Sequence, residues 1–130
     1  MDTIIRLASA SDLSFLAEHD RHIALSELDN AIRLGRVLLL ETAVGEPIGW
    51  LRWNLFWDNT PFMNLLYLLE DYRMQGLGRA LTRHWEQQMR ELLEQQIQLE
   101  YLKLSETHEK ELNRLITHDG NVKAKIEAEK

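Results

Sequence analysis

The chain has 130 residues, of which 45% are hydrophobic and 28% charged, and this is the composition of one folded domain rather than of a disordered or fibrous chain. A formal net charge of −6 and the lack of any basic run argue against nucleic-acid binding, which needs clustered Lys and Arg. Cysteine is absent and no apolar run has the length of a signal peptide or a membrane span, so we expect no disulfide, no membrane association and a cytoplasmic location.

The first 35 residues predict one strand followed by two helices. Residues 3–8 form a short run rich in β-branched side chains, which is typical of a strand. Ser9 and Asp12 then have the spacing of a capping box, which predicts the start of a helix. Ser26 with Asp29 predicts the start of a second helix, which Gly35 would end.

The next segment predicts a meander of three strands. Residues 36–43 and 48–57 are strand candidates, and the turn VGEP between them suggests a hairpin. DNTP at residues 58–61 breaks the pattern, and FMNLLYLL, residues 62–69, then predicts a strand buried on both faces. The middle strand carries four aromatic residues that could line an acceptor pocket or a subunit interface, although a core position is favoured for those on one face: Trp50, Trp53, Phe56 and Trp57.

The stretch EDYRMQGLGRAL, residues 70–81, lies where this last strand becomes a helix. Backbone N–H groups in the first turn of a helix lack intrahelical partners, so a loop of this kind can bind an anion. Gly76 and Gly78 would let the backbone approach the anion, while Arg73 and Arg79 would supply charge. The dinucleotide fingerprint fails at Leu81 and the Walker motif is absent, so spacing alone leaves a plain structural turn equally open.

After residue 85 the composition favours helix, and two interpretations compete. In the first, residues 77 to about 118 form one long helix with an apolar stripe: Met89, Leu93, Ile97, Tyr101, Leu104, Leu112 and Leu115. In the second, residues 97–104 form a strand and residues 107–120 a helix. The long helix is favoured because no turn signal separates Leu93 from Ile97, and Asp119-Gly120 would end it. We expect the exposed stripe to form a homodimer, the alternative being that it packs on its own sheet.

The segment YLLEDYRMQGLGRALTRHWE closely resembles the acyl-CoA-binding motif of the GNAT superfamily of N-acetyltransferases, whose pattern is [QR]-x-x-G-x-[GA] after a strand. Arg73, Gly76 and Gly78 match it. The preceding order of elements is also similar, and residues 49–73 look like a small bacterial branch of the family. The resemblance covers about residues 1–90. It implies an α/β fold with a mixed sheet, altered at the C-terminus by the long helix, with residues 1–94 as the acetyl-CoA-binding domain and residues 95–130 as its helical extension.

The resemblance also implies a function and a site. The chain would transfer acetyl from acetyl-CoA to a primary amine of a small molecule or protein. The Leu68 and Leu69 backbone would pair with the pantetheine like an added strand. The backbone N–H groups that would hold the CoA pyrophosphate belong to Met74, Gln75, Gly76, Leu77, Gly78 and Arg79.

The groups that would move protons are not assigned by the resemblance. GNAT proteins usually continue with a strand and a helix whose tyrosine acts as general acid, and here Tyr101 is the only tyrosine after the loop. Base candidates near strand ends are Glu41, Asp58 and Glu70. The rival hypothesis is therefore a degenerate relative that binds CoA or dimerises without turnover. His19 and His22 have an i, i+3 spacing but no third ligand, so no metal site is expected.

Overall fold

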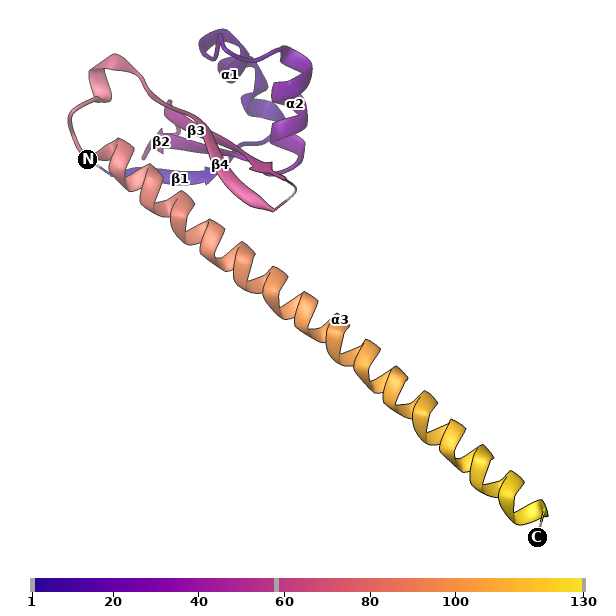
Figure 1. The fold of residues 1–130 in the computed structure, drawn as a ribbon. Coiled ribbons are helices and arrows are strands. Elements are labelled where there is room, and N and C mark those ends of the chain that lie inside the picture. Colours follow the sequence, from indigo (N-terminus) through magenta and orange to yellow (C-terminus); the bar gives the residue numbers. More distant parts are fainter. Residues whose placement is uncertain (1, 58, 130) are drawn as a thin grey trace. The chain divides into compact units, whose positions relative to one another are not determined.

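Four strands form one sheet in the computed structural model of the chain, which describes the backbone of residues 2–57 and 59–129 and the side chains as far as residue 117. The strands are β1 (Thr3–Leu7), β2 (Val37–Thr42), β3 (Pro47–Phe56) and β4 (Thr60–Leu68), and they lie in the order β1-β2-β3-β4. The helices are α1 (Leu13–His19), α2 (Leu25–Arg33) and α3 (Leu77–Glu129), with short 3-10 turns η1 (Ala10–Asp12) and η2 (Glu70–Tyr72) (Figure 1). The predicted order of strand, two helices, meander, loop and helix is confirmed.

The predicted α/β fold with a long C-terminal helix is confirmed, while all three strand pairings in the described residues are antiparallel rather than mixed. The physical reason is connectivity. A parallel neighbour for β4 needs a crossover that returns a strand to the sheet, and the described chain from Leu77 to Glu129 is helix instead.

One face of the sheet packs against α1 and α2, which lie together on that side in Figure 1. Val37, Leu39 and Trp50 point to this face because alternate strand residues share a side. They bury Leu16 of α1 and Leu28 of α2 almost completely. The second helix begins at Leu25 with Ala24 as its N-cap, so Ser26 and Asp29 lie inside α2 and do not open it as predicted.

The opposite face is covered by the beginning of α3. Leu38, Leu40 and Leu51 alternate with the residues of the first face and are fully buried. Leu77 and Leu81 of α3 are buried as well. The meander therefore lies between two layers of helix, and the first turns of α3 are fixed against it.

The fourth strand differs from the sequence prediction. FMNLLYLL was expected to be buried on both faces, but no residue of β4 is fully buried in the structure. The reason is that β4 is the edge of the described sheet, with β3 as its one neighbour. An edge strand presents a row of unpaired backbone groups that can accept a further strand or an extended ligand.

The long helix predicted for the tail is confirmed, and the alternative with a strand at residues 97–104 is wrong. The helix does not end at Asp119-Gly120 but runs on to Glu129. The chain divides into two compact units, Met1–Met89 and Arg90–Lys130. Among the described residues, no helix has the length and apolar character needed to cross a membrane.

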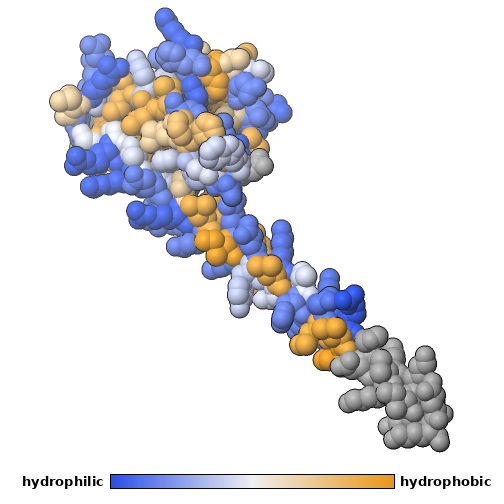
Figure 2. All heavy atoms as spheres, viewed as in Figure 1, coloured by the Kyte–Doolittle hydropathy of each residue, from blue (hydrophilic) through white to orange (hydrophobic). Residues whose placement is uncertain are grey.

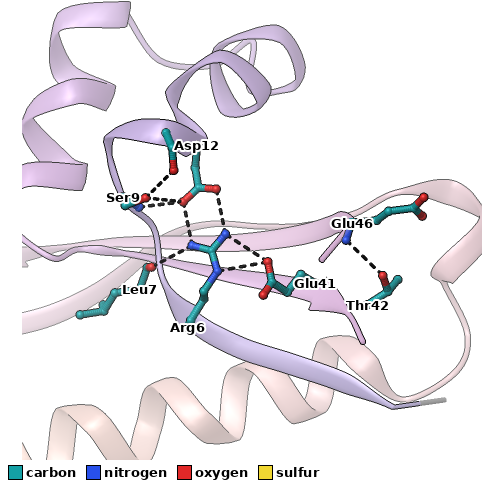
Figure 3. Close-up of polar contacts among 8 residues, drawn as sticks. Arg6, Leu7, Ser9, Asp12, Glu41, Thr42 and Glu46 are labelled. Atoms are coloured by element: carbon teal, nitrogen blue, oxygen red, sulfur yellow. Dashed lines mark hydrogen bonds and ion pairs between the residues drawn. The ribbon is translucent and has the colours of Figure 1, made fainter. Parts of the chain in front are cut away.

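A small ionic cluster fastens β1 to η1 and β2 (Figure 3). Arg6 donates to both carboxylate oxygens of Asp12, at 2.8 and 2.9 Å, and to Glu41 at 3.1 Å. The Ser9 N–H donates to Asp12 at 2.7 Å, and the predicted capping box is present. These hydrogen bonds, that from Arg6 foremost, hold the pKa of the Asp12 carboxyl below its usual value.

Candidate functional site

The loop between β4 and α3 begins from a firmly held strand end. The Leu69 N–H donates to the Ile48 carbonyl at 2.8 Å, which keeps β4 paired with β3 up to that residue. In the 3-10 turn that follows, the Tyr72 N–H donates to the Leu69 carbonyl at 2.9 Å. Residues 73–76 then lead directly into α3. Strand, loop and helix therefore follow one another as the sequence predicts.

Two residues of this loop have left-handed backbone conformations. Met74 has φ of 64° and Gly76 has φ of 79°. Such a conformation is unfavourable for a residue with a Cβ atom, and the Met74 side chain is fully exposed, so its packing does not explain the conformation. Turns of this kind gather successive backbone N–H groups around a concavity that can bind an anion.

The N–H groups of residues 74–79 are available for such a ligand. The first backbone hydrogen bond of α3 runs from the Ala80 N–H to the Gly76 carbonyl at 3.1 Å. Within the described part of the chain, the backbone N–H groups from Met74 to Arg79 donate no hydrogen bond. Together with the positive end of the helix dipole, they form a surface that favours negative charge.

Arg73 lies against β4 rather than over the loop. Its Nε donates to the Leu68 carbonyl at 2.9 Å, and its guanidinium carbon lies 5.1 Å from the centre of the Tyr67 ring. The side chain thereby ties the loop to the end of the strand. Arg79 is exposed on the first turn of α3, and Gln75 donates from its side chain to the Asp71 carbonyl at 3.3 Å.

Two glycines lie near the end of β4, and one of them allows a close approach of the backbone. A Cβ atom at Gly49 would lie 2.5 Å from Leu68 Cδ2 and 2.9 Å from the Tyr67 carbonyl oxygen, so β3 and β4 approach closely there. A Cβ atom at Gly78 would lie 3.6 Å from Leu68 Cδ1, an ordinary contact distance, and Gly78 therefore marks where α3 rests on β4.

The free edge of β4 presents the backbone groups of alternate residues. Because the Leu69 N–H points to β3, the N–H and C=O groups of Leu66 and Leu68 point away from β3. The Leu69 N–H is thus already engaged with Ile48. The Leu68 carbonyl carries the Arg73 hydrogen bond, whereas its N–H faces the open edge.

The proton-transfer candidates from the sequence are not brought together in the described residues. Glu41 is in an ion pair with Arg6, and Glu70 is exposed in η2. Tyr101 lies in the second unit with 69% of its surface exposed. Asp58 lies outside the described residues. No cluster of three or more His, Cys, Asp or Glu that could hold a metal is present among the residues that the structure describes.

The four aromatic residues of the middle strand divide into two pairs. Trp50 and Trp53 are buried in the core, although alternation along the strand would place them on opposite faces. Phe56 and Trp57 are exposed, by 48% and 88%. The aromatic run is therefore partly core and partly surface.

A buried polar group that the sequence did not indicate lies at the C-terminal end of α1. The side chain of Asp20 has no exposed surface, and it accepts hydrogen bonds from Arg52 Nε at 2.7 Å and Trp50 Nε1 at 3.2 Å. Beside it, a cavity of about 310 Å³ opens between this end of α1 and the sheet. The spacing of Asp20 to its partners along the chain is 30 or more residues, so no local pattern could have revealed them.

Comparison with protein-family models gives one match, to the acetyltransferase (GNAT) family, over residues 4–113. No curated protein matches the sequence. The family match confirms the resemblance read from Arg73, Gly76 and Gly78.

Several solved structures share the fold. N-acetylglutamate synthase from Neisseria gonorrhoeae, solved with coenzyme A and N-acetyl-glutamate, is 21% identical with a TM-score of 0.56, covering 69% of this chain and 23% of its own. PaiA N-acetyltransferase from Thermoplasma acidophilum, solved with coenzyme A, is 20% identical with a TM-score of 0.60. The match covers 70% of this chain and 74% of the PaiA chain. Diaminobutyrate acetyltransferase EctA from Paenibacillus lautus is 18% identical with a TM-score of 0.52. The match covers 64% of this chain and 55% of the EctA chain. The chain thus spans under a quarter of the synthase and about half of the EctA enzyme.

Proposed function

Because the chain belongs to the acetyltransferase (GNAT) family, we propose that it is an N-acetyltransferase that moves the acetyl group of acetyl-CoA to a primary amine of a small molecule or protein. The observation that carries this proposal is the row of unengaged N–H groups at residues 74–79, directly after the edge strand β4. Similar folds solved with coenzyme A support it. A cytoplasmic location, where no disulfide is needed, accords with the absence of cysteine.

In this proposal the backbone from Met74 to Arg79 holds the pyrophosphate, and Arg79 adds a positive charge. The pantetheine runs along the free edge of β4, where Leu68 and Leu66 offer their N–H groups. Residues 1–94 form the acetyl-CoA-binding domain and residues 95–130 its helical extension. The acyl group needs no activation beyond its thioester, so the protein's task is to position the amine and to accept its proton.

The experiment that tests the function measures thiol release from acetyl-CoA with a panel of primary amines, alongside calorimetric titration with CoA. We expect CoA binding and acetylation of at least one amine. Failure to bind CoA would contradict the assignment of residues 74–79 as the pyrophosphate site. Binding without turnover on any amine would instead support the rival function, a relative that binds CoA without catalysis.

The rival function is favoured by one specific observation. From Leu77 to Glu129 the described chain is a single helix, so no later strand of the described chain lies beside β4. The resemblance leads one to expect a strand at that place and a general acid on the helix after it. A chain lacking both would keep the binding surface and lose the acid.

The second unit supports a further part of the proposal, which is that the chain forms a homodimer through α3. Hydrophobic side chains lie exposed along this helix (Figure 2). Leu93, Leu104 and Leu115 are spaced by 11 residues, close to three turns, so they share one side of the helix. Ile97 and Tyr101 lie on the same side and are 66% and 69% exposed. Pairing with a second copy would remove this apolar stripe from water.

We expect sedimentation to show a dimer for the full chain and a monomer for the double variant Leu104→Lys, Leu115→Lys, because two charges would then be buried in the stripe. Gln95→Lys with Asn113→Lys is the matched control, since helical spacing places these residues on the opposite side. The control should remain a dimer. A monomeric full chain, or a dimer that persists in the stripe variant, would end the proposal.

A further inference from the structure

A cavity of about 310 Å³ lies wholly within the first unit, between the end of α1 and the sheet. The residues of the chain that line it come from the end of α1 with the loop after it, and from β3 and β4: Glu18, His19, Asp20, Arg21, His22, Trp50, Leu65 and Tyr67. Its volume is at the lower limit of small-molecule sites, which suits a compact ligand. The walls from the sheet are mainly apolar and aromatic.

The cavity borders the strand that we assign to the pantetheine. Leu65 and Tyr67 belong to β4 and come just before Leu68. The Tyr67 ring also contacts the Arg73 guanidinium at the start of the loop, at 5.1 Å. An acyl-CoA whose pyrophosphate sits at residues 74–79 and whose arm runs back along β4 would bring its thioester beside these residues. A ligand in the cavity would then lie next to the acetyl group.

His19 is held in one tautomer at this cavity. Its Nδ1 lies 2.9 Å from the Phe15 carbonyl oxygen, and a carbonyl can only accept, so Nδ1 carries the hydrogen. In the neutral ring Nε2 then has a free lone pair, and it makes no hydrogen bond to any described residue. The ring is also packed, with its centre 4.3 Å from that of Phe15 and 6.4 Å from that of Trp50. Its orientation is therefore fixed.

The other ionisable groups around the cavity are less suited to accept a proton. Asp20 is saturated by Arg52, Trp50 and the His22 N–H, so its charge is already balanced. The side chains of Glu18, Arg21 and His22 are exposed at the cavity mouth. The Tyr67 ring is covered by Arg73, whose guanidinium carbon lies 5.1 Å from the ring centre.

The geometry points to His19 as the general base of the acetyl transfer, with the cavity it lines as the site of the acceptor, a compact primary amine. This inference rests on the proposed function and deepens it. The ammonium form of the amine gives one proton to Nε2, and the neutral nitrogen attacks the thioester carbonyl. The C–N bond forms, the C–S bond breaks, and the electron pair leaves on the CoA sulfur. The amide nitrogen loses its second proton, one proton ends on the CoA thiol, and His19 returns the other to water.

The test uses the full chain with acetyl-CoA and three probe amines, phenethylamine, L-lysine and putrescine. His19→Asn keeps a donor where Nδ1 lies but has no base at the Nε2 position, and His19→Gln places an amide there that cannot accept the proton. We expect both to lower kcat by about 10²-fold or more, the usual contribution of a positioned base, with KM for acetyl-CoA unchanged. His84→Gln, an exposed residue of α3, is the control and should keep full activity.

Two further readouts separate a base from a structural role. The activity of the His19 variants should continue to rise as the pH approaches about 10, near the pKa of a free primary amine. Without the base, only amine that is already neutral in solution can react. Long-range proton–nitrogen NMR of the wild-type chain should show Nδ1 protonated and Nε2 unprotonated. Retained kcat in both variants, or the opposite tautomer, would overturn the inference. A wild-type chain that binds CoA but acetylates none of the probes would contradict the proposed function itself and leave CoA binding intact, so the two failures are distinguishable.

Discussion

Substituting Asp for Gly76 is expected to weaken CoA binding by at least about 100-fold, because hydrogen bonds to charged groups contribute about 1.5–3 kcal/mol each and the new carboxylate would repel the pyrophosphate that accepts them. No atom lies within 4 Å of the position that a Cβ atom at Gly76 would take, so the side chain itself fits. The new carboxylate would, however, stand beside the N–H groups of residues 74–79, where the pyrophosphate is proposed to bind. Calorimetric titration with CoA measures the change.

The cost of the backbone conformation must be separated from that of the charge. Gly76 has φ of 79°, and a residue with a Cβ atom there is strained by about 1–2 kcal/mol. Gly45 is a close match, since it has φ of 87° and equally open surroundings in the turn between β2 and β3. Gly45→Asp should therefore show a similar fall in the midpoint of urea unfolding and normal CoA affinity. Equal CoA affinity in the two folded variants would refute the loop as the pyrophosphate site.

The order of the elements was predictable from the sequence because it depends on local patterns. Two apolar runs joined by a turn signal marked β2 and β3, and Gly35 marked the end of α2, where it has φ of 70°. The loop could be located by the same means, but only the resemblance carried by Arg73, Gly76 and Gly78 distinguished a ligand site from a turn. Local spacing does not encode what a loop binds.

What the sequence did not reveal depends on contacts between distant residues. The apolar composition of β4 predicted burial on both faces, yet burial is set by the neighbours of a strand, and β4 has one described neighbour. Gly120 predicted the end of α3, because glycine weakens a helix by about 1 kcal/mol, but one glycine does not outweigh the favourable residues around it. The role of His19 depends on its ring contact with Trp50, which no pattern along the chain contains.

Removing the Asp20 carboxylate is expected to have the largest effect on stability. Asp20→Ala leaves the Arg52 guanidinium, whose side chain is only 11% exposed, without its partner, and Trp50 Nε1 without an acceptor. Breaking a buried ion pair by deleting one partner costs about 3–5 kcal/mol. Since small domains are stable by about 5–15 kcal/mol, a large part of the folding free energy would be lost. Urea unfolding followed by circular dichroism measures it.

Asp29→Ala is the matched control for this loss. Asp29 forms an ion pair with Arg33 at 3.0 Å one turn along α2, but Arg33 is 76% exposed. Exposed pairs of this spacing contribute about 0.3–0.5 kcal/mol. The difference in unfolding free energy between the two Asp→Ala variants therefore measures the effect of burying the ion pair, because both variants lose the same charge. A cost for Asp20→Ala within about 1 kcal/mol of the control would contradict the expectation.

A double variant shows whether the cost arises from the orphaned charge or from the missing pair. Replacing a buried ion pair by apolar residues is often neutral, whereas leaving one charge behind is not. Asp20→Ala combined with Arg52→Met should therefore be more stable than Asp20→Ala alone, although the Trp50 N–H still lacks an acceptor. If it is, the pair serves to fix the end of α1 over β3 rather than to add net stability. That is the role the cavity requires, because Asp20 directly follows His19 and anchors the segment that places the His19 ring beside Trp50.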